Sequence, residues 1–336
     1  MTKHSGSRLR FPTKKHLWFG IRLAVTIALC WWIATQVDWR LLASKLYNAS
    51  PWMIALVIGL GFVAVALSSY KWQQLLLMHG LAYPLMRLGR WYLIATFLSR
   101  ALPTNIGGDA YRIYKTLDNT RGRTCAVLAV IADRFTGLVA LLLMGYVAAV
   151  ISWGQTGHPL SANLAALGTA GLIAGLLTLF VLVRWSLMQK LAGIRIGPMS
   201  LSALMKHAGE YMRDRRRLAA VMAISLLFHA NRILCMWLLV KAVDASCQVT
   251  DLAVALAAMT VIGLLPISIG GLGLVDGAFI VIMGQYGLPQ EAALSAMLLT
   301  RALVIPIHLL GAVLYFRGDR EKLPRRGAQD LVRNAG

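Results

Sequence analysis

Six apolar stretches are each long enough to cross a lipid bilayer as an α-helix, and they restrict the fold of this chain more than any other feature. They cover residues 17–37, 52–70, 125–151, 163–183, 218–240 and 290–316. Hydrophobic residues make up 58% of the 336 residues, and the mean hydropathy is +0.65. Soluble globular domains are less apolar than this, so the sequence predicts an all-α integral membrane protein.

Two shorter apolar segments, 91–102 and 252–265, end in the same sequence phrase. Leu-Pro-x-x-x-Gly-Gly occupies 102–108 in the first copy and 265–271 in the second. Proline and paired glycines interrupt a helix, and a further short segment follows each break. These further segments are 109–117 and 275–284. Each copy therefore predicts a broken helix rather than a continuous one.

Lysine and arginine are concentrated on one side of the predicted membrane. Of the 34 basic residues, 26 fall in 1–16, 71–90, 104–124, 184–217 and 317–336, and three fall in the segments between. This distribution indicates that the basic side faces the cytoplasm, next to an anionic membrane surface. It accounts for the net charge of +21 without a nucleic-acid partner. We expect a multi-pass protein of the bacterial cytoplasmic (inner) membrane with both termini in the cytoplasm.

This charge pattern also predicts how the broken helices lie. Segments 71–90 and 104–124 share the basic side, so the first break belongs to a hairpin that enters the membrane and returns. Residues 252–284 form a second hairpin that enters from the opposite side. The fold class is thus six full transmembrane helices plus two re-entrant broken-helix hairpins, arranged as an inverted-topology repeat of halves 52–151 and 218–316. The alternative is eight full spans with kinks.

One transmembrane domain, 17–316, accounts for most of the chain. The basic N-terminus 1–16 and the tail 317–336 are expected in the cytoplasm. The first span is too long for a signal-peptide core and lacks a small-residue cleavage site, so we expect it to be retained. The cytoplasmic basic segment 184–217 is either an interfacial amphipathic helix or a solvated linker.

Three arginines lie deep inside predicted spans: Arg134, Arg232 and Arg301. A charge in the middle of a membrane is costly, so each is expected to face the bundle interior and to have a function or a partner. The planar guanidinium suits capture of a phosphate. The alternative is a salt bridge to one of the available carboxylates, which are Asp109, Asp133, Asp276 and Glu291.

The breaks themselves supply further candidate residues. A helix that begins after a Gly-Gly pair presents unpaired N–H groups and a partial positive charge, which favour an anion. The predicted substrate-binding residues are Arg134, Arg301, Arg232, Asn105, Gly107, Gly108, Asp109, Gly270, Gly271 and Asp276. For Asp109 and Asp276 the alternative role is to cap the second helix of each hairpin. Asp133 and Asp276 are predicted proton carriers.

The sequence contains no motif that indicates bond-making chemistry. No HExxH, GxSxG or nucleotide-binding loop is present, and the four cysteines form no metal-binding pair. We therefore expect no catalytic residue, no metal, no cofactor and no enzymatic activity.

The two break regions resemble the signatures of the flippase-like family, the transmembrane domain of lysylphosphatidylglycerol synthases. The first signature comprises Leu102-Pro103, Gly107-Gly108-Asp109, Arg112 and Asp133-Arg134. The second comprises residues 265–279, Gln290-Glu291-Ala292-Ala293 and Thr300-Arg301. The chain differs from the family at Val275-Asp276, where Arg or Glu is frequent. It also ends about twenty residues after its last span, without an aminoacyl-transferase domain, so it resembles a stand-alone member.

This resemblance implies movement of an anionic phospholipid, or of a glycolipid or polyprenyl-phosphate substrate, between the leaflets. The expected partners are an anionic lipid headgroup and a soluble lipid-modifying or envelope-biosynthesis enzyme. Two alternatives stay open: an integral membrane enzyme acting on a lipid-linked substrate, and a non-catalytic membrane partner that recruits such an enzyme through 184–217.

Overall fold

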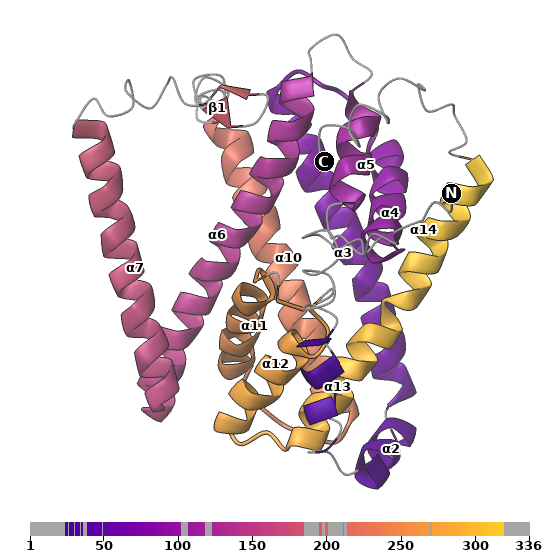
Figure 1. Cartoon of the computed structure of the whole chain (residues 1–336), viewed down its shortest axis with the longest axis vertical. Helices are drawn as coiled ribbons and strands as arrows, with labels where there is room; N and C mark the ends of the chain where they lie inside the picture. The colour runs from indigo at the N-terminus through magenta and orange to yellow at the C-terminus, as the bar shows by residue number, and fades with distance from the viewer. Residues whose placement is uncertain are drawn as a thin grey trace, which may run out of the picture.

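The computed structural model consists almost entirely of helices (Figure 1). It describes residues 24–25, 27–29, 31–33, 35, 39–48, 50–101, 107–117, 123–184, 195–196, 199–200, 211, 214–265, 267–268 and 271–318. Most of the predicted first span, both chain ends and most of 184–217 lie outside these ranges. Within 184–217, β1 (Arg195–Ile196) and β2 (Met199–Ser200) form a short antiparallel pair, so these four residues are not part of an amphipathic helix.

Among the residues that the structure describes, four helical stretches are long and apolar enough to cross a membrane. They are Pro51–Met78, Cys125–Thr156, Arg215–Ala242 and Gln290–Arg317. The first three belong to α3 (Pro51–Met78), α6 (Arg123–Thr156) and α10 (Arg215–Ala242). Many of their apolar side chains are exposed, as expected for helices that contact lipid. The chain is therefore a multi-pass membrane protein.

The fourth stretch was predicted as one helix, 290–316, but it contains a break. α13 (Gln290–Leu303) ends at Val304, and α14 (Ile305–Gly318) starts directly after it. Pro306 has no N–H to donate to the carbonyl group four residues earlier, which interrupts the hydrogen-bond ladder. The predicted loop 71–90 also differs, because α3 continues to Met78. Trp72 is fully buried in this extension, and apolar packing keeps it helical.

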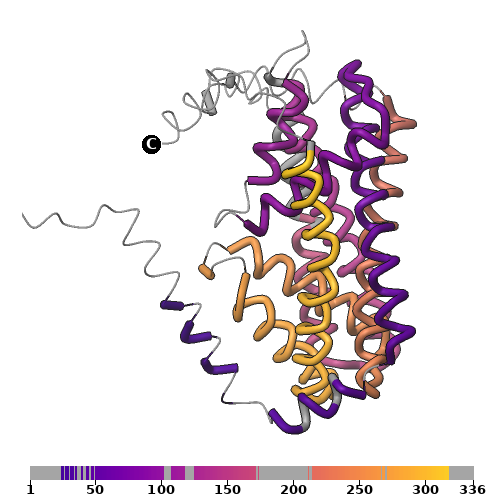
Figure 2. The backbone as a smooth tube through the Cα atoms, turned by 90° about the vertical axis from the view of Figure 1, so that its right-hand side faces the viewer, coloured from indigo at the N-terminus to yellow at the C-terminus, as the bar shows by residue number. Residues whose placement is uncertain are grey.

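Both predicted breaks separate two short helices. The first lies between α4 (Leu85–Ala101) and α5 (Gly107–Thr116), and the second lies between α11 (Val249–Gly263) and α12 (Leu274–Gln285). The two helices of each hairpin pack against one another. In Figure 1, α4 and α5 occupy the upper part of the molecule, whereas α11 and α12 occupy the lower part. The tube view separates the two hairpins in the same way (Figure 2).

The two halves of the chain pack in a reciprocal way. The two first helices, α3 and α10, run antiparallel, with hydrogen bonds that join Ser50 to Ala242, Asn231 to Leu60 and Arg217 to Leu77. Hairpin helix α4 packs on α14 of the other half, and hairpin helix α11 packs on α6 of the first half. Each hairpin therefore packs on a long helix of the other half, and the inverted-topology repeat itself stays a prediction.

Two further helices, α7 and α2, pack against these elements. α7 (Pro159–Arg184) covers the predicted span 163–183 and meets α6 at the lower end of Figure 1. A hydrogen bond of 2.8 Å between the Ser152 and Ser161 hydroxyl groups joins these two helices there. Short α2 (Trp39–Tyr47) packs against α13. The larger apolar core surrounds α10 to α13, and a smaller core lies between α3, α4 and α6.

Candidate functional site: aspartate–arginine pairs at the two helix breaks

The first break carries an ion pair between α5 and α6. Arg134 on α6 donates from Nε to Asp109 Oδ2 and from Nη2 to Asp109 Oδ1, each at 3.1 Å. Two parallel bonds of this kind fix the orientation of both groups. Asp109 is the third residue of α5, so its charge also lies where the N–H groups of that helix are unpaired. The Arg134 side chain is 64% exposed.

The second break carries the corresponding ion pair between α12 and α13. Arg301 donates from Nη2 to both carboxylate oxygens of Asp276, at 2.6 and 2.8 Å, and from Nε at 3.0 Å. Asp276 Oδ2 also accepts from the Gly273 N–H at 3.0 Å. This bond confirms that Asp276 caps α12. The Arg301 side chain is 25% exposed, so this pair is better shielded than the first.

The two pairs are equivalent in position. In each, the arginine follows the aspartate by 25 residues, and the aspartate is the third residue of the second hairpin helix. Both arginines therefore form a salt bridge to one of the available carboxylates, and a substrate-binding role for either stays a prediction. The N-terminal ends of α5 and α12 carry a partial positive charge, and in this structure they face the carboxylates of Asp109 and Asp276.

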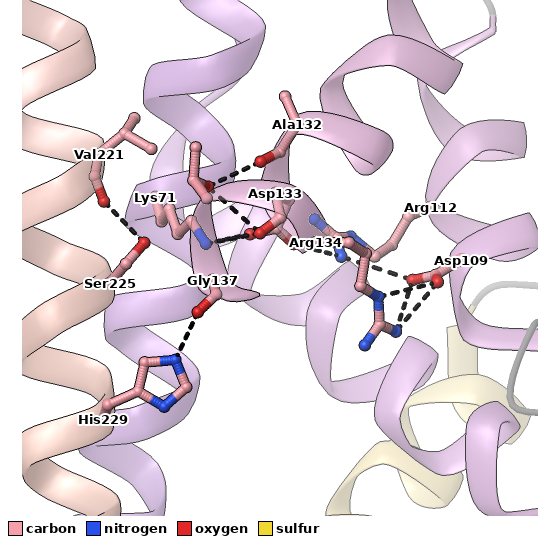
Figure 3. Close-up of polar contacts among 11 residues, drawn as sticks. Lys71, Asp109, Arg112, Ala132, Asp133, Arg134, Gly137, Val221, Ser225 and His229 are labelled. Atoms are coloured by element: carbon pink, nitrogen blue, oxygen red, sulfur yellow. Dashed lines mark hydrogen bonds and ion pairs between the residues drawn. The ribbon is translucent and has the colours of Figure 1, made fainter. Parts of the chain in front are cut away.

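The first pair belongs to a larger buried network, shown in Figure 3. Asp133 lies between two cations, with Lys71 Nζ 3.0 Å from Oδ1 and Arg112 Nη1 2.9 Å from Oδ2. Lys71 also donates to the main-chain carbonyl of Asp133 at 2.7 Å. Arg112 Nη1 lies 3.7 Å from Asp109, which connects this network to the Arg134 pair. Three cations thus surround two carboxylates.

Arg112 is the most enclosed of these cations, with 3% of its side chain exposed. Its guanidinium carbon lies 4.5 Å from the centre of the Trp72 ring and 5.1 Å from the centre of the Tyr92 ring. Stacking on aromatic faces stabilises a desolvated guanidinium. Arg112 Nε and Nη2 have no hydrogen-bond partner among the described residues.

Sequence reasoning missed two residues of this network. Lys71 was assigned to a loop, but it lies on α3 and is 6% exposed. The available signal was Trp72, whose size favours continuation of the apolar helix past the lysine. Arg112 appeared in the family resemblance without a role. Its position three residues after Asp109 on a short helix was the signal for a shared site.

The described glycines of the breaks have distinct roles. A Cβ atom on Gly108 would lie 2.3 Å from the Ala95 carbonyl oxygen, so glycine is required for α5 to approach α4 this closely. Gly107 begins α5. Gly271 has a φ of +75°, which an L-residue with a side chain rarely adopts. Asn105 and Gly270 lie outside the described residues.

Arg232 lies apart from both pairs. Its Nη2 is 3.5 Å from the Thr260 hydroxyl on α11, and it shares no ion pair with a described carboxylate. It borders a cavity of about 10 Å³ between α6, α10 and α11, together with His229. His229 Nε2 donates to the Gly137 carbonyl at 2.9 Å. The cavity has room for one water, not for a phosphate, so a substrate-binding role for Arg232 stays a prediction.

The described residues contain no group of three or more His, Cys, Asp or Glu side chains that could hold a metal ion. Cys125, Cys235 and Cys247 are free thiols. Burial raises the pKa of Cys247, between α10 and α11, to about 11, so its thiol stays protonated. Asp133 and Asp276 are bound to cations. A proton-carrier role for either requires its ion pairs to open and stays a prediction.

These features define a helical multi-pass membrane protein whose two helix breaks hold matched ion pairs. The chain belongs to the lysylphosphatidylglycerol synthase TM region family, whose profile matches residues 19–311. A comparison with curated proteins finds no significant match. The family suggests a membrane protein in lipid or envelope biosynthesis.

Proposed function

We propose that this protein translocates a lipid with an anionic headgroup between the leaflets of the bacterial cytoplasmic membrane. The substrate is an anionic phospholipid or a lipid-linked glycolipid or polyprenyl phosphate. The observation that carries this proposal is the pair of equivalent aspartate–arginine contacts, one at the break of each hairpin. Two similar anion-handling sites in opposite parts of a bundle suit a substrate that passes from one side to the other.

The arrangement of the hairpins supports this reading. If α4–α5 enters from the cytoplasmic side and α11–α12 from the outer side, the packing exchange between halves is an inverted-topology repeat, with both termini in the cytoplasm. Broken helices at membrane depth need protein or water around them. The breaks then provide the polar path for the headgroup, while the acyl chains stay in lipid.

Exchange of partners at the arginines gives a simple mechanism. A phosphate oxygen displaces Asp109 from Arg134 or Asp276 from Arg301, and the aspartate takes the arginine back when the phosphate leaves. The exposure of Arg134 supports access from the surroundings of the helix bundle. No bond is made or broken, so we propose transport without catalysis. A soluble envelope-biosynthesis enzyme would supply or consume the lipid.

Leaflet exchange in proteoliposomes tests the proposal. Labelled phosphatidylglycerol and a polyprenyl phosphate are compared with phosphatidylcholine in vesicles with and without the protein. We expect faster exchange of the anionic lipids only. Arg134→Gln and Arg301→Gln should each slow exchange about tenfold, because each removes charge-assisted hydrogen bonds of roughly 1.5–3 kcal/mol.

Exposed Arg216, at the start of α10, provides the matched control: Arg216→Gln removes the same charge and should leave the rate unchanged. No acceleration for any anionic lipid would refute translocation. A change in the mass of the lipid would instead indicate an enzyme.

A further inference from the structure

Asp109 lies between two arginines and is hydrogen-bonded to one of them (Figure 3). Its carboxylate accepts two hydrogen bonds of 3.1 Å from Arg134, whereas Arg112 Nη1 lies 3.7 Å from Oδ1. A separation of 3.7 Å is too long for a hydrogen bond, although the two charges still attract one another. A shift of about 1 Å brings the Asp109 carboxylate into hydrogen-bond distance of Arg112.

Arg112 has unused donors for a second carboxylate. Its Nη1 carries two N–H groups and lies 2.9 Å from Asp133 Oδ2, which leaves one N–H group for Asp109. Arg112 Nε and Nη2 are shielded from solvent and have no hydrogen-bond partner among the described residues. Asp109 is well placed to bind Arg112 more closely, because it lies three residues earlier on the same helix.

The two arginines differ in their access to the surroundings of the bundle. The Arg134 side chain is 64% exposed, whereas the Arg112 side chain is 3% exposed and its guanidinium group lies against the Trp72 ring. An anion that arrives from outside the bundle can therefore reach Arg134 but not Arg112. Arg134 is the arginine that can exchange partners, and Arg112 is held in place.

The charges of the network make a second partner for Asp109 necessary. Lys71, Arg112 and Arg134 carry three positive charges, and Asp109 and Asp133 carry two negative charges. A phosphate monoanion on Arg134 balances the total, but it also repels the carboxylate of Asp109 at close range. A hydrogen bond from Arg112 to Asp109 offsets this repulsion.

The second break lacks an equivalent of Arg112. Phe279 stands three residues after Asp276, and Arg301 is the one cation bonded to Asp276 among the described residues. A displaced Asp276 keeps the N–H group of Gly273, which is a neutral donor. A cation that can hold the displaced aspartate is therefore a feature of the first break.

We propose that Arg112 is a positioning residue that holds Asp109 when the phosphate of an anionic headgroup binds Arg134. This inference rests on the proposed function and deepens it, because it identifies the residue that makes release of Arg134 possible. The Asp109 carboxylate turns toward Arg112 as the phosphate binds, and it returns to Arg134 when the phosphate leaves. Asp133 stays paired throughout. Arg112 itself does not contact the lipid.

A double-mutant cycle on lipid binding tests this role. Dihexanoyl phosphatidylglycerol, zwitterionic dihexanoyl phosphatidylcholine and glycerol 3-phosphate are titrated separately into the purified full-length protein, and native mass spectrometry measures occupancy. Arg112→Gln should weaken phosphatidylglycerol binding about tenfold, because Asp109 then competes with the phosphate for Arg134. In the Asp109→Asn background no carboxylate competes, so Arg112→Gln should change binding by about twofold or less.

Further variants separate this role from a folding defect and from a general effect of charge. Asp133 keeps its ion pair with Lys71 in Arg112→Gln, and thermal stability is measured for every variant. If Arg112→Gln does not fold, Arg112→Lys enters the same cycle, with an expected loss of about threefold in the wild-type background only. Lys115→Gln is the matched control, because it removes a positive charge from the same helix and should change binding by about twofold or less.

The outcomes separate the role of Arg112 from the proposed function. An equal loss of binding in both backgrounds indicates a structural role and overturns the inference, even if the protein moves lipid. A lack of phosphatidylglycerol binding by the wild-type protein overturns it as well. A loss confined to the wild-type background, without any leaflet exchange in proteoliposomes, supports the inference and refutes translocation. Glycerol 3-phosphate that binds as tightly as the lipid, with the same dependence on Arg112, supports the exchange at Arg134 but identifies a free phosphate ester as the ligand.

Discussion

The two hairpins hold the same aspartate–arginine pair in very different surroundings. Three residues after Asp109 the chain has Arg112, but three residues after Asp276 it has the fully buried Phe279. The residue before Arg134 is Asp133, whereas the residue before Arg301 is Thr300, which hydrogen-bonds to its own helix. The first pair is therefore part of a charged network, and the second is surrounded by apolar packing.

This difference separates what holds each hairpin in place. Ion pairs from Asp133 to Lys71 and Arg112 connect α3, α5 and α6. At the second break, Asp276 is the one described residue that connects α12 to α13 by polar contacts, and the core around these two helices is apolar. We infer that the first hairpin depends on a buried anion and the second on a helix cap.

The largest difference is expected when the buried anion is removed. Asp133→Asn leaves Lys71 and Arg112 without a countercharge, and loss of one partner from a buried ionic group costs about 3–5 kcal/mol. Thr300→Val, at the corresponding position, removes one hydrogen bond within its helix and a long contact to Met236 Sδ, and it should cost about 1 kcal/mol or less. Unfolding by SDS in detergent micelles, followed by circular dichroism, measures both. Equal losses would show that the network does not anchor the first hairpin.

Replacing the aspartate of each pair should give a smaller difference in the free energy of unfolding. Asp276→Asn weakens the bonds to shielded Arg301 and the cap of α12 together, which predicts a loss of about 2–3 kcal/mol. Asp109→Asn affects an arginine that is 64% exposed, so the loss should be about 1 kcal/mol or less. The same SDS titration compares them. A larger loss for Asp109→Asn would mean that Arg134 is shielded by lipid.

The sequence predicted those parts of the fold that depend on hydropathy and helix breakers. Both broken helices, the span covered by α7 and the salt-bridge alternative for Arg134 and Arg301 follow from such local patterns. The network did not follow, because Lys71, Arg112 and Asp133 are brought together from three separate helices.

Glycine replacement distinguishes the backbone roles at the two breaks. Gly108→Ala places a methyl group against the Ala95 carbonyl and the Ser99 side chain, so α5 must move away from α4. Overpacking of this kind costs about 1–3 kcal/mol. Gly271→Ala instead strains a residue with φ of +75°, which costs about 1–2 kcal/mol without separating the helices. Disulfide trapping between cysteines placed on α4 and α5 should therefore slow in the first variant only, whereas both variants should lose stability.

The smallest expected effect concerns the shape of the cation and not its charge. Arg301→Lys keeps the positive charge but loses two of the three bonds to Asp276, because an ammonium group cannot match the carboxylate with a planar fork. Arg301→Lys should lower the free energy of unfolding by about 1 kcal/mol. Arg134→Lys should lower it by about 0.5 kcal/mol or less, because the Arg134 pair is more exposed. The SDS midpoint measures the difference. A larger loss of stability for Arg134→Lys would show that the first pair depends on the planar shape of the guanidinium group. The two breaks would then differ only in the Asp133 network.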